Sequence, residues 1–318
     1  IGSYNGNKLR IPASNLKLLS TAYTLSKYNI SDSLNTSIYR DNSNNYYLIG
    51  SGDPDLSIID LNKLLNKINF KNNFNFYILE IDKRKKWPNG WTEEDKLYSY
   101  GSPITSLAIK SNQNNYIDIY YVKNLIDNYF KINYPSYNFN LSLLDFNKKH
   151  VKNLKLVSQI KSNPIISLIT LANSESHNFT AESLYKNASN SWNDNTYTKI
   201  KYWLKFKGLP VKNILINDAS GLSRDNRLTT NLAALFLHKI RYSKNFEFYN
   251  SSLSILGIRG TLSNRSKNTE IASRFFGKTG TLSNVFALSG YLYKDNDILS
   301  VSIIQNSNKI NINKSFVL

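Results

Sequence analysis

The residue pair with the clearest chemical potential lies near the start of the chain, where Ser14 is followed three positions later by Lys17. A serine hydroxyl is a poor nucleophile unless a neighbouring base takes its proton. Two side chains three positions apart share one face of a helix, so the lysine amine reaches the hydroxyl. The spacing therefore makes Ser14 a candidate nucleophile and a neutral Lys17 its candidate general base. A surface lysine on an amphipathic helix is the alternative.

Two more motifs complete an ordered set. Ser176-His177-Asn178 lies in the middle of the chain, and Lys278-Thr279-Gly280, followed by Thr281, lies near its end. Each motif alone is weak, because Ser-x-x-Lys also occurs at 158–161 and 183–186. The order Ser-x-x-Lys, Ser-x-Asn, Lys-Thr-Gly is nevertheless the one that serine acyl-transfer enzymes use. A helix cap at the second motif and an ordinary edge strand at the third are the structural alternatives.

Helices and a strand are expected to position these side chains. Residues 16–25 have apolar side chains at helical spacing, which places Ser14 and Lys17 near the N-terminus of a helix. An apolar helix over 164–172 ends beside the second motif, and a strand over 275–281 carries the third. Further helices are predicted over 181–188, 198–206 and 230–240, and further strands over 286–293 and 298–305.

The region between the first two motifs differs in character. Asn-rich loops alternate with short strand-like runs at 46–49, 76–79 and 116–121, and residues 61–68 are typical of a short helix. We therefore predict an inserted α/β region over residues 30–155. Residues 1–29 and 156–318 are then expected to form the catalytic domain together.

Composition narrows the function classes. Of the 318 residues 41% are hydrophobic, which suffices for a sizeable core. There is no Cys, which excludes disulfides and thiolate chemistry, and the three His residues lie far apart, so we predict no metal site and no cofactor. The net charge of +18 is spread along the chain rather than clustered, which argues against nucleic-acid binding and suits an anionic cell wall or membrane face. No apolar run is long enough to span a bilayer. Because the sequence contains no Met, the chain is expected to be a mature or trimmed product.

The sequence around the motifs resembles one protein family over nearly the whole chain. The matching segments are Arg10 to Thr21, Gly52-Asp53-Pro54, Asp218 to Arg224, Arg259 to Leu262 and Gly277 to Leu282. The family is the D-Ala-D-Ala carboxypeptidase/endopeptidase family of low-molecular-mass penicillin-binding proteins. Its members carry a large insertion between the first two motifs, and the long separation of these motifs here implies such an insertion.

The resemblance implies roles for the second motif. Ser176 relays a proton to the nitrogen of the leaving D-Ala, and Asn178 holds the acyl-side amide of the substrate and steadies Lys17. Lys17 must be neutral when it acts, which requires burial or a nearby positive charge to lower its pKa, and Lys278 would supply such a charge.

At the third motif the resemblance implies substrate binding and an oxyanion hole. Lys278 and Thr279 bind the terminal carboxylate of the substrate by charge and by a hydroxyl hydrogen bond. Gly280 lets the substrate backbone approach closely. The backbone N–H groups of Ser14 and Thr281 stabilise the oxyanion.

The resemblance also implies a fold. This is an α/β (α+β) fold of the penicillin-binding transpeptidase and serine β-lactamase-like type. It has an antiparallel sheet flanked by helices, a helical lobe and the inserted α/β domain.

The implied activity is that of a serine-type D-Ala-D-Ala carboxypeptidase or endopeptidase. Such an enzyme acts on peptidoglycan peptides through an acyl-enzyme on Ser14 and is inhibited by β-lactams. It works in the periplasm or on the cell-wall side of the cytoplasmic membrane, where a basic surface would favour peripheral wall or membrane association. The alternatives are a β-lactamase or esterase on the same fold and a catalytically silent peptidoglycan-binding protein.

Overall fold

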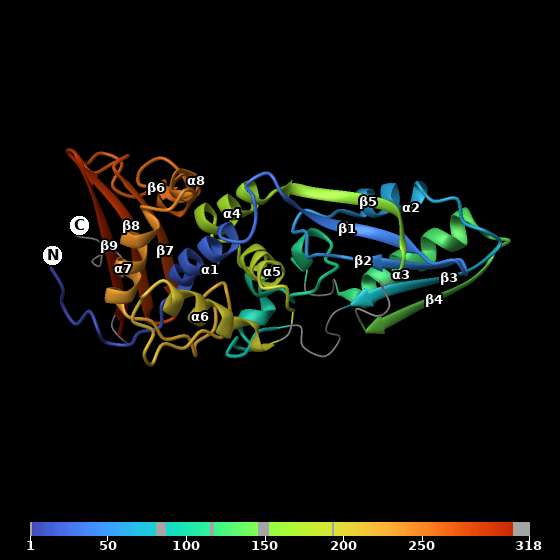
Figure 1. The fold of residues 1–318 in the computed structure, drawn as a ribbon, viewed down its shortest axis with the longest axis horizontal. Helices are drawn as coiled ribbons and strands as arrows, with labels where there is room; N and C mark the ends of the chain where they lie inside the picture. The colour runs from blue at the N-terminus through green and yellow to red at the C-terminus, as the bar shows by residue number, and fades with distance from the viewer. Residues whose placement is uncertain (1, 81–86, 115–117, 146–152, 193, 308–318) are drawn as a thin grey trace. The chain divides into compact units, whose positions relative to one another are not determined.

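The computed structural model describes residues 2–80, 87–114, 118–145, 153–192 and 194–307. The chain forms two compact units, each of which is described by itself. Unit 1 comprises residues 1–31, 88–92 and 165–318, and unit 2 comprises residues 32–87 and 93–164. Figure 1 shows their elements, coloured from the N-terminus to the C-terminus.

Unit 1 contains an antiparallel sheet with the strand order β6-β7-β8-β9. The strands are β6 (Ser254–Ile255), β7 (Phe275–Leu282), β8 (Val285–Lys294) and β9 (Asp297–Asn306). Asn284 and Asp295 adopt positive φ values of 62° and 52° in the tight turns between the long strands, a conformation that Asn and Asp tolerate better than most residues. The three predicted strands are confirmed to within one residue at each end.

The helices of unit 1 gather around α1, which contacts α4, α5 and α6. All ten residues of α1 are buried, which explains why its apolar residues extend beyond a single face. Helix α7 packs on β8 and β9, as Figure 1 shows. The helices are α1 (Leu16–Leu25), α4 (Ile165–Ser174), α5 (Asn178–Ala188), α6 (Thr198–Phe206), α7 (Thr230–Ile240) and α8 (Phe246–Ser251), with short 3-10 helices η1 (Ala13–Asn15), η6 (Asp194–Tyr197) and η7 (Gly260–Leu262).

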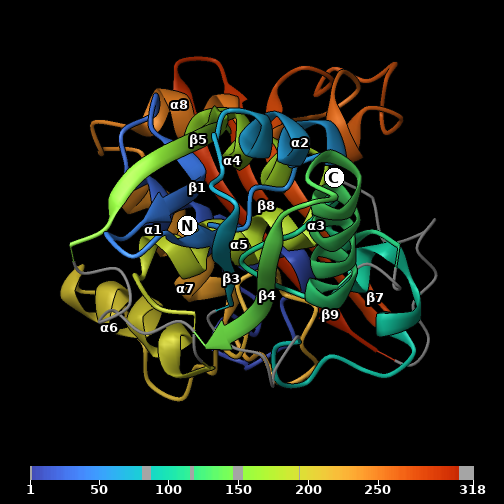
Figure 2. The same cartoon turned by 90° about the vertical axis from the view of Figure 1, so that its right-hand side faces the viewer.

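Unit 2 contains a mixed sheet with the strand order β4-β3-β2-β1-β5. Strands β2, β3 and β4 are parallel neighbours joined through α2 and α3, because parallel strands need a crossover connection. Strand β1 is antiparallel to both β2 and β5. In Figure 2, α3 runs alongside β4.

The strands of unit 2 are β1 (Ser33–Arg40), β2 (Asn45–Ile49), β3 (Asn73–Glu80), β4 (Asn138–Asp145) and β5 (Lys155–Pro164). Its helices are α2 (Ile58–Asn66), α3 (Ile119–Asn133), η2 (Asp95–Leu97), η3 (Ser99–Gly101) and η4 (Lys110–Asn112). Across the described part of both units, no helix has the length and apolar character needed to cross a membrane.

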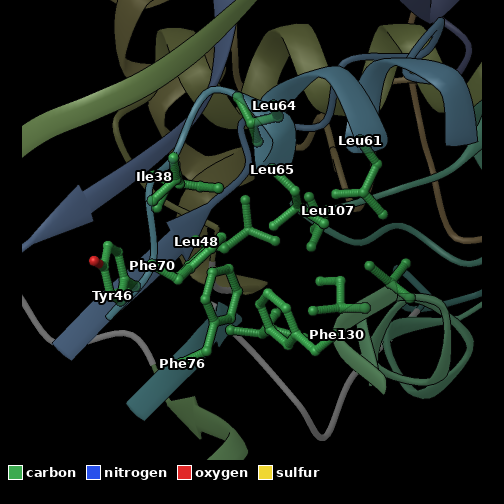
Figure 3. Packing of buried hydrophobic residues seen from close by; sticks show 14 of the residues in the cluster. Ile38, Tyr46, Leu48, Leu61, Leu64, Leu65, Phe70, Phe76, Leu107 and Phe130 are labelled. Atoms are coloured by element: carbon green, nitrogen blue, oxygen red, sulfur yellow. The ribbon is translucent and has the colours of Figure 1, made fainter. Parts of the chain in front are cut away.

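Aromatic rings form the centre of the core in unit 2. Figure 3 shows Phe70, Phe76 and Phe130 packed together beside Leu48 and Leu65. The centroid of the Phe130 ring lies 5.1 Å from those of both Phe70 and Phe76, in the edge-to-face arrangement that aromatic pairs prefer. Burial of these rings explains how a region rich in polar Asn residues forms a core of its own.

The strand predicted over 116–121 is wrong where the structure describes it; residues 115–117 lie outside the described residues. The carboxylate of Asp118 accepts hydrogen bonds from the backbone N–H groups of Tyr120 and Tyr121 at 2.8 and 3.1 Å and caps α3. The buried residues of this helix are Ile119, Val122, Ile126 and Phe130. These residues recur at spacings of three and four positions from Ile119 to Phe130 in a helix of 15 residues, so helical packing outweighs the short alternating pattern.

The limits of unit 2 also differ from the predicted insertion over 30–155. Strand β5 pairs with β1 along its length, which places residues 155–164 in unit 2. Residues 88–92 belong to unit 1 instead, where the indole N–H of Trp91 donates to the carboxylate of Asp218 at 3.0 Å. Contacts distant in sequence set both limits, and composition does not reveal them.

The core of unit 2 can be tested at α3. Phe130→Ala removes a fully buried ring and should lower the free energy of unfolding by about 3–5 kcal/mol. Ile132→Ala on the same helix is the control, because Ile132 is 77% exposed and its loss should change stability by less than ~0.5 kcal/mol. Urea unfolding followed by circular dichroism measures both, and equal effects would contradict this core.

Candidate active site

Ser14 lies in a tightly packed turn at the start of α1. Its turn, η1, runs directly into that helix, and the preceding Ala13 is fully buried with a φ of 47°. Gly221 and Gly280 pack against the turn from two other segments. A Cβ on Gly221 would collide with the carbonyl oxygen of Ala13, and a Cβ on Gly280 would lie 3.0 Å from the backbone nitrogen of Ser14. The structure therefore explains Gly280 by its contact with the nucleophile turn, which the sequence did not indicate.

The amine of Lys17 lies at the centre of the site, and its side chain is completely buried. Its Nζ is 3.0 Å from Ser14 Oγ, 2.6 Å from Asn178 Oδ1 and 2.7 Å from the carbonyl oxygen of Ser220. The two carbonyl-type oxygens only accept hydrogen bonds, whereas the hydroxyl also donates. A neutral amine therefore gives its two N–H groups to Asn178 and Ser220 and turns its lone pair toward the hydroxyl of Ser14.

Burial lowers the pKa of Lys17 from 10.5 to about 7, while the nearby carboxylates of Asp218 and Glu182 raise it. Of the two expected causes, burial and the charge of Lys278, burial is the one that lowers this pKa. The charge of Lys17 instead affects Lys278. Burial, and to a smaller extent the charge of Lys17, holds the pKa of Lys278 well below its usual value, while the charge of Glu175 raises it.

The carbonyl that faces Lys17 belongs to a loop wound around the carboxylate of Asp218. This carboxylate accepts hydrogen bonds from the backbone N–H groups of Gly221 at 2.9 Å and Ser223 at 2.7 Å, and from the side chains of Asn226 and Trp91 at 2.8 and 3.0 Å. Because all these donors converge on one buried group, the backbone of the loop is fixed. The loop was recognised in the sequence, but its contact with Lys17 was not.

The third motif lies on β7 beside the nucleophile turn. The amide of Asn15 bridges the two: its nitrogen faces the carbonyl oxygen of Lys278 at 2.7 Å and its oxygen faces the hydroxyl of Ser289 at 2.7 Å, the orientation in which each donor meets an acceptor. Lys278 Nζ donates to the carbonyl oxygen of Thr279 at 3.0 Å, and the Thr279 hydroxyl donates to that of Thr261 at 2.7 Å. Asn15 and Thr261 are contacts that motif spacing did not predict.

The other residues of the motifs follow from these elements. Asn178 is the first residue of α5 and contacts Lys17, as expected. His177 caps the same helix, because its side chain accepts a hydrogen bond from the backbone N–H of Thr180. The helix-cap alternative is thus present at this motif, together with the contact between Asn178 and Lys17. Ser176 precedes the cap with a φ of 63°, and among the described residues no hydrogen bond joins its hydroxyl to Ser14 or Lys17.

Thr281 lies near the end of β7, where it pairs with Phe286 of β8 and its side chain is exposed. The structure therefore brings Ser14, Lys17 and Asn178 into one hydrogen-bonded group, with Lys278 and Gly280 packed beside the nucleophile turn. The relay role of Ser176 and the oxyanion and substrate roles of Ser14, Thr281, Lys278 and Thr279 stay predictions.

Gly221 offers a test of the packing around the nucleophile. Gly221→Ala puts a Cβ into the Ala13 carbonyl at a φ of 84°, which an L-residue rarely adopts, and should destabilise the protein by about 2–4 kcal/mol. Gly2→Ala serves as the control, because nothing lies within 4 Å of its added Cβ. Thermal unfolding measures both, and an unchanged midpoint for Gly221→Ala would refute this packing.

Comparison with known proteins gives the fold and the family of the chain. The chain is 34% identical over 104 residues to a D-alanyl-D-alanine carboxypeptidase from Actinomadura sp. (strain R39), an alignment that spans 31% of this chain and only 19% of that relative. The fold of this chain is similar to that of penicillin binding protein 4 (dacB) from Haemophilus influenzae, with a TM-score of 0.78 and 18% identity. The match covers 98% of this chain and 88% of that protein. It also matches a predatory peptidoglycan endopeptidase from Bdellovibrio bacteriovorus, with a TM-score of 0.60, 15% identity and coverage of 99% and 83%. The model of the D-Ala-D-Ala carboxypeptidase 3 (S13) family matches residues 1–139 and 139–316, so this chain belongs to that family.

Proposed function

We propose that the protein is a serine DD-peptidase that cleaves the D-Ala-D-Ala bond of peptidoglycan peptides through an acyl-enzyme on Ser14. The proposal rests on one observation: the Lys17 amine lies among three oxygens. Two of them, Asn178 Oδ1 and the carbonyl oxygen of Ser220, can only accept hydrogen bonds, and the third is the hydroxyl of Ser14. This arrangement directs the lone pair of a neutral Lys17 at the proton that must leave the nucleophile. Membership of the S13 family supports the substrate class.

In the acylation step, Ser14 Oγ attacks the carbonyl carbon of the penultimate D-Ala while its proton passes to Lys17. The tetrahedral intermediate then collapses, the C–N bond breaks and the terminal D-Ala leaves as an amine. Ser176 relays the proton from the Lys17 ammonium to that nitrogen, which restores the neutral base. Attack by water on the ester releases the shortened peptide and returns the proton to Ser14.

The third motif completes the site in this proposal. Lys278 and Thr279 hold the terminal carboxylate of the substrate, and Gly280 leaves room beside the nucleophile turn. A bound carboxylate favours the charged form of Lys278, so substrate binding offsets the effect of burial on its pKa. The backbone N–H groups of Ser14 and Thr281 stabilise the oxyanion, an interaction whose loss typically costs about 10²–10³ in rate.

The same proposal covers inhibitors and location. A β-lactam would acylate Ser14 and deacylate slowly; a penicillin G-acylated form of the Bdellovibrio endopeptidase and a β-lactam complex of the Haemophilus protein support this. A peptidase of the cell wall acts outside the cytoplasm, so we place the protein in the periplasm or on the wall side of the membrane. A formal net charge of +18 favours peripheral contact with an anionic wall or membrane.

The nucleophile is tested by intact-mass spectrometry after incubation with benzylpenicillin. We expect one penicilloyl adduct per chain, absent from Ser14→Ala, because Ser14 is the serine whose hydroxyl contacts a buried lysine amine. Ser158→Ala is the matched control: Ser158 also begins a Ser-x-x-Lys sequence, but it is buried in β5 of unit 2. This variant should keep the adduct.

Two results would count against the proposal. A folded protein that neither forms an adduct nor hydrolyses the drug would be the catalytically silent wall-binding protein. Rapid hydrolysis of the drug would instead identify a β-lactamase on the same fold.

The general base is tested by the pH dependence of acylation. Lys17 must be neutral to accept a proton, and its pKa is about 7, so the second-order rate constant for benzylpenicillin acylation should rise as the pH increases through about 7 and then level off. A lysine of ordinary pKa would instead give a rate that still rises near pH 10. Stopped-flow measurement from pH 5 to 10 separates the two cases, with circular dichroism to confirm that the fold persists.

A further inference from the structure

We propose that Glu182 is a positioning residue for the general base: it fixes the carbonyl oxygen that orients the Lys17 amine, and its charge helps to set the protonation of that amine. The inference rests on the proposed function, because it assumes that Lys17 accepts the proton of Ser14. None of the three sequence motifs includes Glu182.

The carboxylate of Glu182 is completely buried and clamps a short stretch of backbone. Its Oε1 accepts hydrogen bonds from the backbone N–H groups of Ala219 and Ser220, both at 2.8 Å. Its Oε2 accepts a hydrogen bond from the hydroxyl of Tyr197 at 2.8 Å. Both oxygens are thus paired, and the peptide between residues 219 and 220 has its N–H side tied to α5.

The clamped backbone presents its next carbonyl to the base. The oxygen of Ser220 accepts a hydrogen bond from Lys17 Nζ at 2.7 Å, while the carbonyl oxygen of Ala219 accepts one from Ser20 of α1 at 2.7 Å. Glu182 therefore holds one face of this segment, and α1 contacts the other. Any shift of Glu182 changes the acceptor that keeps the lone pair of Lys17 directed at Ser14.

Helix α5 controls both obligate acceptors of Lys17. Asn178 contacts the amine directly, and Glu182 lies one turn later on the same face of the helix. Two groups on one rigid helix therefore fix the directions of both N–H groups of the neutral amine. The spacing of four positions between Asn178 and Glu182 is the signal in the sequence that could have identified this residue.

The charges around this pair favour an electrostatic link. Asp218 and Lys186 also face Glu182, and the hydroxyl of Tyr197 donates to it. Burial, and to a smaller extent the charge of Asp218, raises the pKa of Glu182 to about 7. The pKa of Lys17 is also about 7. On β7, the charge of Lys17 lowers the pKa of the buried Lys278, and the charge of Glu175 raises it. Since an ionised Glu182 raises the pKa of Lys17, the loss of its charge should lower it.

Two substitutions separate the geometric role from the electrostatic one. Glu182→Gln keeps an oxygen for the two backbone N–H groups and an amide beside Tyr197, but removes the charge. It should shift the midpoint of the acylation pH profile down by roughly one pH unit while the plateau rate is largely kept. Glu182→Ala removes the clamp and should lower the acylation rate by about 10²-fold at every pH, the order of loss that a misplaced catalytic group produces.

Glu247→Gln is the control, because it also removes one carboxylate from unit 1, at an exposed position on α8. It should leave both the midpoint and the plateau unchanged. If the Glu182→Gln midpoint coincides with that of Glu247→Gln, the electrostatic part of the proposal is overturned. If a folded Glu182→Ala keeps the full rate, the positioning part is overturned.

A measurement that does not need activity distinguishes a failure of this inference from a failure of the proposed function. The pKa of Lys17 is followed by NMR of ¹³C-labelled lysine in the parent chain, Glu182→Gln and Glu247→Gln. A lower Lys17 pKa in Glu182→Gln alone supports the link even if the protein does not react with benzylpenicillin. Equal Lys17 pKa values in all three proteins, in a chain that acylates normally, refute the link and leave the peptidase proposal intact.

Discussion

The burial of the Lys17 amine is the constraint on which the rest of the site depends. Removing a lysine from water is costly unless it is paired or loses its proton. Helix α1 is buried along its whole length, so the cost cannot be relieved by turning the side chain to solvent. Three oxygens from the surrounding segments lie within 3.0 Å of the amine and offset this cost by hydrogen bonding. The same oxygens determine that the lone pair of the neutral amine points at Ser14.

That constraint accounts for much of the local architecture of unit 1. One acceptor comes from the first turn of α5 and another from a loop whose backbone is held by two buried carboxylates. The nucleophile turn fits between this loop and β7 because Gly221 and Gly280 leave space for it. Asn15 then ties the turn to the backbone of β7. Segments far apart in the sequence thus share one rigid arrangement, which is what a preorganised site requires.

The elements that carry the motifs were predictable because their signals are local. Residues 16–25 and 230–240 have sustained helical spacing, and the strands that follow residue 275 are separated by short polar turns. Helix α3 was missed because a short alternating run at its start suggests a strand, while its buried residues recur at helical spacing from Ile119 to Phe130. Strands β1, β4 and β5 carry many polar residues, and only their pairing with distant strands identifies them.

For the site, order and spacing identified Ser14, Lys17 and Asn178, because Ser-x-x-Lys and Ser-x-Asn describe neighbours on single helices or turns. Asn15, Ser220 and Glu182 were not assigned to the site, since their contacts with β7, α1 and the loop depend on the folded chain. For the same reason the sequence could not decide whether burial or the charge of Lys278 lowers the pKa of Lys17. Depth of burial is a property of packing, and no short motif records it.

The pairing of β1 with β5 has a consequence for how the chain folds. Ser33 at the start of β1 is paired with Pro164 at the end of β5, and the backbone N–H of Ile166 in unit 1 donates to the carbonyl oxygen of Ile30 at 3.2 Å. More than a hundred residues, all but 88–92 of them in unit 2, thus lie between two neighbouring points of unit 1. Once unit 2 has folded, the connection between α1 and α4 behaves as a short loop. Each halving of loop length lowers the entropic cost of closing the loop by about 0.6 kcal/mol, so about five halvings lower it by roughly 3 kcal/mol. Early folding of unit 2 would therefore speed the assembly of the helices that bury Lys17.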